Sequence, residues 1–258
     1  MNNDTPPADV IPAAVVILMR DGSNGMEILI LRKASGKHFA SGALVFPGGK
    51  VADADIAFTG EIGESRNTVS ILKIAAIREM YEECGIALAR APGNGSFLDT
   101  MTVRKCRAAH NCAPLLELAV LVPLNLAADS LIRFAHWITP PSRPKRFDTH
   151  FFVAIAPPEQ MEPQVDGYEI VDSRWCRPKD LINDFHNGTE KLVLPTLMNV
   201  MKLTEVNSVD EAIQMAHNRK IIPITPTLKA TPAGDQLVIP EEAGYGMTEI
   251  PTAMLRSA

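Results

Sequence analysis

Cysteine is scarce in this sequence, and a long apolar run is missing. The four cysteines lie scattered through 258 residues, at Cys84, Cys106, Cys112 and Cys176. They are too few and too far apart for a disulfide framework in a chain of this size. No stretch approaches the ~20 apolar residues of a membrane span, and the N-terminus has neither a basic start nor an apolar signal core. We therefore expect reduced thiols, no membrane attachment and a cytoplasmic location.

The chain also has no excess of positive charge. It contains 25 Lys and Arg against 30 Asp and Glu, which gives a formal net charge of -5 and a pI near 5.7. Surfaces that bind nucleic acid concentrate Lys and Arg against the phosphate backbone, so this balance argues against a nucleic-acid partner. Hydrophobic residues make up 46% of the sequence, which is enough for a sizeable core.

The apolar pattern predicts an α/β (α+β) fold. Runs at 11–20 and 26–33 flank the turn-forming segment DGSNG and are typical of a hairpin. Further strands are expected at 43–46, 131–140, 148–157 and 168–178. Helices are expected at 68–84, where Gly85 ends the helix, twice within 87–128, and from Pro178 to Gly188. Residues 50–67 are expected to form a loop. Strands on both sides of a long helix suggest a mixed sheet covered by helices.

Three parts of the chain differ in character. Residues 1–10 are a Pro-rich leader, 11–190 form the main domain, and 191–258 form an appendage packed on it. The appendage is expected to contain a helix at 195–203, a second helix opened by the capping-box signature at 208–211, and a hairpin reversed by TPAGD. A lid or a homodimer contact are two uses open to this appendage.

Three like charges fall within one turn of the helix predicted at 68–84. Glu79, Glu82 and Glu83 share one face, because positions i, i+3 and i+4 are neighbours on a helix. Each like-charge pair costs roughly 0.2–0.5 kcal/mol, and Arg78 is the local compensating charge. Two interpretations follow from the spacing alone: a solvated acidic face, or a set of ligands for a metal ion.

The segments FPGG (46–49) and REMYEECGI (78–86) together resemble the box of the Nudix hydrolases. The second segment matches that pattern at every specified position. The first half departs from it, because Asp55 stands where the box has Glu, and an insertion at about 56–70 separates Asp55 from Arg78. The resemblance implies a Nudix-like α/β/α sandwich with a mixed sheet over roughly 11–190.

The resemblance also implies a site for Mg²⁺ or Mn²⁺, which hard carboxylate oxygens suit. Glu82 and Glu83 would be the main ligands, with Glu79 beside them and Arg78 orienting a glutamate. The Gly49 carbonyl would complete the shell, and Asp55 or nearby Asp53 would replace the missing carboxylate. Nudix enzymes take a general base from a later loop; the candidates are Glu159, Glu162 and Glu169, of which we favour Glu169.

The stretch before FPGG partly resembles the additional signature of coenzyme A diphosphatases. A better resemblance over the whole chain is to the Nudix branch that contains the peroxisomal coenzyme A diphosphatase, because that branch carries an insertion within the box and a strand like FDTHFF (147–152). The substrate contacts implied are Arg32, Lys37, Phe39, Gly42, Phe46 and Gly48. Basic side chains there would meet a ribose phosphate, and Phe39, Trp137 or Phe147 would stack on adenine, although core packing is the alternative for each ring.

These features favour a metal-dependent diphosphatase acting on a nucleoside diphosphate linked to another moiety, with coenzyme A or acyl-CoA as the leading substrate. ADP-ribose and the reduced nicotinamide dinucleotide are the main competitors. A Nudix-fold module that binds nucleotide without catalysis is the alternative outside the enzyme class, and it is motivated by Asp55 in place of Glu.

Overall fold

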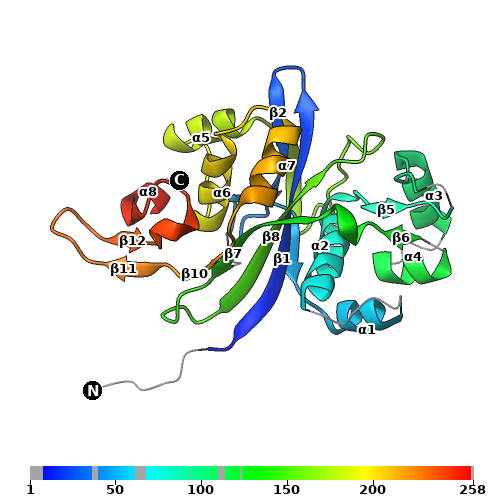
Figure 1. Ribbon diagram of the computed structural model, residues 1–258, viewed down its shortest axis with the longest axis horizontal. Coiled ribbons are helices and arrows are strands. Elements are labelled where there is room, and N and C mark those ends of the chain that lie inside the picture. The colour runs from blue at the N-terminus through cyan, green and yellow to red at the C-terminus, as the bar shows by residue number, and fades with distance from the viewer. Residues whose placement is uncertain are drawn as a thin grey trace.

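The computed structural model describes residues 8–36, 40–61, 68–93, 95–109, 114–122 and 124–256. A mixed β-sheet forms its centre, and helices lie on both sides of the sheet (Figure 1). This arrangement confirms the predicted α/β class and the mixed sheet. Most of the expected leader, residues 1–7, lies outside the described part of the chain.

The central sheet has the strand order β10-β7-β8-β1-β2-β3, with β4 added to β1 and β9 added to β2. Its strands are β1 (Val10–Gly22), β2 (Gly25–Lys33), β3 (Leu44–Val45), β4 (Gly48–Lys50), β7 (Ile132–Ile138), β8 (Arg146–Ile155), β9 (Ile170–Cys176) and β10 (Pro223–Ile224). β1 and β8 are parallel, whereas β1 runs antiparallel to β2 and to β4. The register of β1 matters for the site, because Ala14 pairs with His150 on one side and with Gly49 on the other.

Two hydrophobic cores cover the two faces of this sheet. The first contains Ala14, Val16 and Phe152 from the sheet and the apolar side of helix α2 (Thr68–Cys84). The second contains Ile17 and Val153. Helices α5 (Pro178–His186), α6 (Leu194–Leu203) and α7 (Val209–Asn218) pack into this second core. Side chains alternate between the faces along each strand, so a residue's position in a strand decides which core or site it meets.

The remaining elements lie at the two ends of the molecule (Figure 1). Near α2 lie α1 (Asp53–Glu61), α3 (Thr100–Ala109), α4 (Leu115–Leu121) and the small sheet of β5 (Ala89–Arg90) and β6 (Asn125–Leu126). At the other end lie β11 (Thr227–Lys229), β12 (Gln236–Val238), β13 (Glu249–Pro251) and α8 (Thr252–Arg256). The three strands form a separate antiparallel sheet, which includes the hairpin expected after α7.

Helix α2 begins and ends where the sequence predicts. It spans Thr68–Cys84, and Gly85 follows with φ 71°, the left-handed conformation that commonly ends a helix. The N-cap of α7 is also as predicted, because the Ser208 side chain accepts a hydrogen bond from the Glu211 backbone N–H at 3.3 Å. Both predictions depend on short-range backbone chemistry.

The prediction of a loop over 50–67 was wrong for the part that the structure describes. Residues Asp53–Glu61 form α1, and residues 62–67 lie outside the described part. Phe58 is the large apolar side chain that α1 buries, whereas Ile56 is 44% exposed. The helix therefore lacks a continuous apolar stripe, and the buried Asp55 described below holds it against α2.

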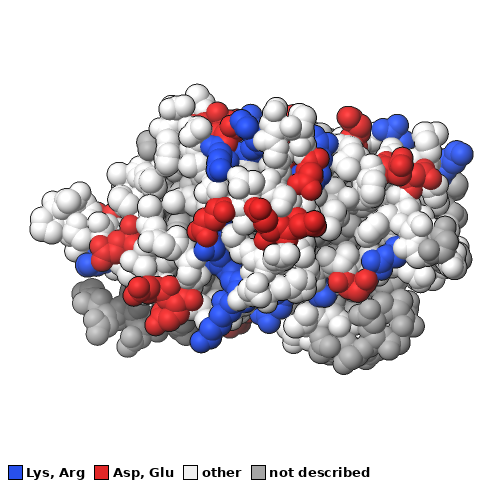
Figure 2. Space-filling model, turned by 45° about the horizontal axis from the view of Figure 1, so that its top comes forward, with Lys and Arg blue, Asp and Glu red and all other residues white. Residues whose placement is uncertain are grey.

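The C-terminal segment contributes to the central sheet. Leu192 forms a parallel bridge to Leu44, and β10 extends the sheet beside β7. The proposed division of the chain at residue 190 stays a prediction. Within the described residues, no helix is long and apolar enough to cross a membrane. Acidic and basic side chains lie interspersed on the face drawn in Figure 2.

Candidate metal-binding and catalytic site

The diglycine bend and the acidic end of α2 lie against each other. The Gly48 N–H donates to Glu83 Oε2 at 2.8 Å. A Cβ atom placed on Gly49 would lie 2.4 Å from Cδ of Glu79, so only glycine allows this carboxylate to approach the bend. Two segments that are more than 25 residues apart in the sequence thus bring a backbone N–H group and two carboxylates together.

Gly48 is required for a second reason. Its φ is 153°, which side chains rarely adopt, and an added Cβ would lie 2.4 Å from the backbone oxygen of Ala14. The bend therefore closes directly on β1. This close approach fixes the position of the bend relative to β1.

Arg78 holds two of the three glutamates. Its Nη1 donates to Glu79 Oε1 and to Glu82 Oε2, each at 2.9 Å, and its Nη2 donates to the Lys50 carbonyl at 3.1 Å. The Arg78 side chain is only 9% exposed. One guanidinium therefore fixes the positions of two carboxylates and of the backbone that follows the bend.

Asp55 lies beneath this guanidinium and is completely buried. Its Oδ1 accepts from Arg78 Nε at 2.8 Å, and its Oδ2 accepts from Arg78 Nη2 at 3.0 Å and from the Ala52 N–H at 2.8 Å. Both carboxylate oxygens are thus occupied. These contacts favour a positioning role for Asp55 over the expected role as a metal ligand. The other candidate, Asp53, is exposed in the first turn of α1.

Burial is the largest cause of the raised pKa of two glutamates in the cluster. It raises the pKa of Glu83 to about 8, against the opposing effects of the Gly48 hydrogen bond and of Lys33. It also raises the pKa of Glu79. For Arg78, burial is outweighed by the hydrogen bond to Asp55 and the neighbouring negative charges, which together raise the pKa. Arg78 therefore stays charged, whereas the charge of Lys33 offsets the burial of Glu83 only in part.

The donor set has the oxygen chemistry that a hard divalent cation prefers. Glu79, Glu82 and Glu83 supply carboxylate oxygens, and their side chains range from 38% exposed at Glu82 through 18% at Glu79 to the nearly buried Glu83. Glu83 forms no ion pair with any residue that the structure describes. An oxygen-only set with one under-compensated buried carboxylate suits Mg²⁺ or Mn²⁺, which keep waters and substrate oxygens in their remaining positions.

The favoured general base lies near this cluster. Glu169 is 65% exposed, and its Oε1 pairs with Lys33 Nζ at 2.6 Å. Both Glu169 and Lys33 act electrostatically on Glu83. The other two candidates, Glu159 and Glu162, are also exposed.

The residues expected to contact substrate are dispersed. Arg32 Nη2 donates to the two carboxylate oxygens of Glu190 at 2.8 and 2.9 Å. Arg32 Nη1 donates to the Gly42 carbonyl at 3.4 Å. Phe46 is 3% exposed and packs in the second core, which favours a packing role. Lys37 and Phe39 lie outside the described residues. Of this set, Gly48 is in direct contact with the acidic cluster.

Two features were missed by the sequence interpretation. Glu190 is 7% exposed and also lies 3.2 Å from Arg174 Nη2, so it ties β2 to β9. His136, Asp148 and His150 lie together on the central sheet. The alternation of Asp148 and His150 along a predicted strand was a signal for this group, but only the strand pairing brings His136 beside them.

A diglycine bend held against the Arg- and Glu-rich end of a helix is the arrangement of the Nudix class. Comparison with known families agrees, because the model described as the NUDT19 Nudix domain matches residues 62–203, more than half of the chain. The chain belongs to this Nudix hydrolase family.

Similar proteins come from animals and bacteria. A nudix hydrolase relative from Caenorhabditis elegans is 26% identical, covering 77% of this chain and 62% of its own. The acyl-coenzyme A diphosphatase NUDT19 of Homo sapiens is 24% identical, covering 80% and 65% respectively. The chain thus spans less than two thirds of the length of both relatives. The crystal structure of a NUDIX hydrolase from Alicyclobacillus acidocaldarius has a TM-score of 0.66 and 26% identity, covering 80% of this chain and 96% of that one.

Proposed function

We propose that this chain is a divalent-metal-dependent diphosphatase that hydrolyses a nucleoside diphosphate linked to another moiety. The observation that supports this most strongly is the contact of Gly48 and Gly49 with Glu83 and Glu79. It brings the bend into contact with two of the three glutamates, beside a guanidinium that Asp55 holds.

In this proposal, Glu79, Glu82 and Glu83 bind Mg²⁺ or Mn²⁺. The bound ion supplies charge neutralisation on the diphosphate and lowers the pKa of the attacking water. Arg78 holds Glu79 and Glu82 in the orientation that binding requires, and Asp55 holds Arg78. Such positioning through a chain of charge-assisted hydrogen bonds keeps the ligands preorganised.

Glu169 is the proposed general base. Its Oε1 is engaged by Lys33, so Oε2 is the atom left to accept a proton from water. The Lys33 ammonium would then hold the carboxylate in place during the transfer. A base must lie within hydrogen-bond reach of the proton that it removes, and the electrostatic effect of Glu169 on Glu83 supports its proximity.

Coenzyme A or an acyl-CoA is the substrate class that we favour. Support comes from the resemblance of the segment around Arg32 and Gly42 to the coenzyme A diphosphatase signature, and from relatives named acyl-coenzyme A diphosphatase NUDT19. Because Glu190 holds the Arg32 guanidinium, we assign Arg32 a structural role beside the site rather than direct contact with substrate.

A substrate panel tests the proposal. The chain is incubated with coenzyme A, an acyl-CoA, ADP-ribose or the reduced nicotinamide dinucleotide, in Mg²⁺ or Mn²⁺, and the products are measured by mass spectrometry. We expect metal-dependent formation of phosphopantetheine, free or acylated, and an adenosine bisphosphate. Glu82→Gln should abolish most turnover, whereas Glu117→Gln, an exposed control on α4, should not. Turnover of ADP-ribose alone would exclude coenzyme A, and nucleotide binding without any turnover would favour a non-catalytic module.

A further inference from the structure

A group of two histidines and one aspartate lies on the central sheet, apart from the acidic end of α2. The ligand atoms of His136, Asp148 and His150 all lie within 4.8 Å of one another. The three side chains are 15%, 31% and 13% exposed, respectively, so they are sheltered and still reachable from solvent.

The strand register brings these residues together. Asp148 and His150 are two residues apart on β8 and therefore point to the same face. His136 lies directly opposite His150 on the neighbouring strand β7. The two residues of β8 and their partner on β7 therefore place three side chains next to one another on one face of the sheet.

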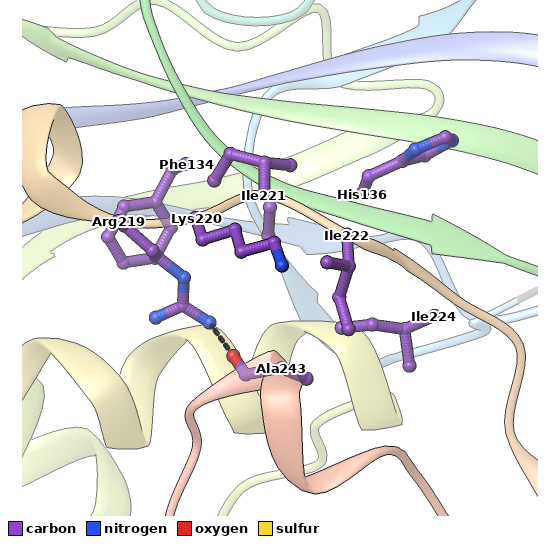
Figure 3. A pocket seen from close by; sticks show the side chains of 9 residues that line it. Phe134, His136, Arg219, Lys220, Ile221, Ile222, Ile224 and Ala243 are labelled. Carbon is purple, nitrogen blue, oxygen red and sulfur yellow. Dashed lines mark hydrogen bonds between the residues drawn. The ribbon is translucent and has the colours of Figure 1, made fainter.

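This face is the one that α2 covers. Phe152 and Ala154 continue the same side of β8 and belong to the first core. On the opposite face, β7 and the C-terminal segment form a small pocket in which Arg219 donates to the Ala243 carbonyl at 2.8 Å. Figure 3 shows the His136 ring directed away from that guanidinium. The imidazole therefore belongs to the group with Asp148 and His150.

We propose that His136, Asp148 and His150 form a second metal site, which takes a divalent transition-metal ion such as Zn²⁺. Two imidazole nitrogens and one carboxylate oxygen are ligands for zinc and its neighbours, whereas Mg²⁺ prefers oxygen ligands throughout. Three protein ligands leave a fourth position for water or another ligand.

The distances suit such an ion after a small movement. Nε2 of His150 lies 3.5 Å from Oδ1 of Asp148, close to the edge of about 3.4 Å in a tetrahedron with metal–ligand bonds of about 2.1 Å. Nε2 of His136 contacts the same oxygen directly. The two rings stack with centroids 3.9 Å apart and planes 21° apart. Binding therefore requires the rings to tilt and His136 to separate from Asp148.

The contacts of the group leave one ring nitrogen of His150 without a partner. Nδ1 of His150 is buried and has no hydrogen-bond partner in the part of the chain that the structure describes. An imidazole binds a metal ion through either Nε2 or Nδ1, so His150 has two nitrogens to offer.

The site lies near the acidic cluster but is distinct from it. Across the sheet, His150 pairs with Ala14 and Ala14 pairs with Gly49. Two strand spacings separate His150 from Gly49, which is roughly 10 Å. The two groups share no side chain, so each can be tested without removing the other.

The experiment measures Zn²⁺ bound to the full chain by equilibrium dialysis in excess Mg²⁺, which occupies the carboxylate site. We expect one Zn²⁺ per chain. His150→Gln, His136→Gln and Asp148→Asn should each weaken binding by about tenfold or more. His217→Gln, which removes an exposed imidazole from α7, should leave it unchanged.

The visible spectrum of bound Co²⁺ provides a second measurement. Four-coordinate Co²⁺ absorbs much more strongly than six-coordinate Co²⁺, so we expect the strong bands in the wild-type chain and their loss in His150→Gln. Circular dichroism establishes that each variant is folded. The proposal is overturned if no Zn²⁺ is retained in Mg²⁺, or if folded cluster variants bind it as the wild type does. If all the cluster variants unfold, a wild-type Co²⁺ spectrum with only weak bands overturns it.

Discussion

Asp55→Asn is the substitution that most sharply tests how the acidic cluster is held. The change preserves the shape of the side chain but removes its charge and places an amide N–H₂ where Arg78 also donates. Asp55 is fully buried and the Arg78 side chain is 9% exposed, so solvent replaces the lost charge poorly. Arg78 keeps its ion pairs with Glu79 and Glu82, so the cost is that of hydrogen bonds to a charged group, about 1.5–3 kcal/mol.

A loss of this size should be plain in thermal unfolding. For a domain of this size, each kcal/mol lowers Tm by roughly 2–4 °C, so Asp55→Asn should lower Tm by about 3–12 °C. Activity should fall as well, because Arg78 would lose the contacts that fix its guanidinium beside Glu79 and Glu82. Asp53→Asn is the matched control, since this exposed acid in the first turn of α1 interacts with the helix dipole and should cost about 0.3–1 kcal/mol. Equal melting of the two variants would refute the positioning role of Asp55.

Three further predictions concern the bend, the buried glutamate and the C-terminal helices. Gly49→Ala should lower turnover about 100-fold while the chain stays folded, because the new Cβ displaces the end of the Glu79 side chain; unchanged kinetics would contradict the close approach. Without metal, the free energy of unfolding should fall as pH rises from about 4.3 towards about 8, because folded Glu83 keeps a proton that the unfolded chain releases. Denaturant titrations across pH should show this slope, and Glu83→Gln should flatten it. Ser208→Ala should cost about 1 kcal/mol by removing the N-cap of α7, and a Tm equal to that of the wild type would contradict it.

The sequence predicted the features that depend on local chemistry. The apolar period and Gly85 located α2 to the residue, and the turn residues of DGSNG located the hairpin of β1 and β2. The Nudix-like segments identified the acidic helix and the bend as partners, and the structure places them in contact. Such features need only neighbouring residues or a pattern of fixed spacing.

The features that the sequence did not predict depend on contacts between distant segments. Helix α1 lacks a clear apolar stripe, and Asp55 ties it to Arg78, 23 positions later. Arg32 pairs with Glu190, 158 positions away. His136 meets Asp148 and His150 because β7 and β8 pair in one particular register. In each case a charged or titratable side chain is placed by tertiary packing, which residue spacing does not reveal.

The central claim is that the bend at Gly48 and Gly49 and the three glutamates of α2 together hold a divalent cation. A crystal soaked with Mn²⁺ and measured for anomalous scattering tests this directly. We predict a peak about 2.1–2.2 Å from carboxylate oxygens of Glu82 and Glu83, beside Glu79 and the Gly49 carbonyl. A map with no peak there at saturating Mn²⁺ would contradict the account.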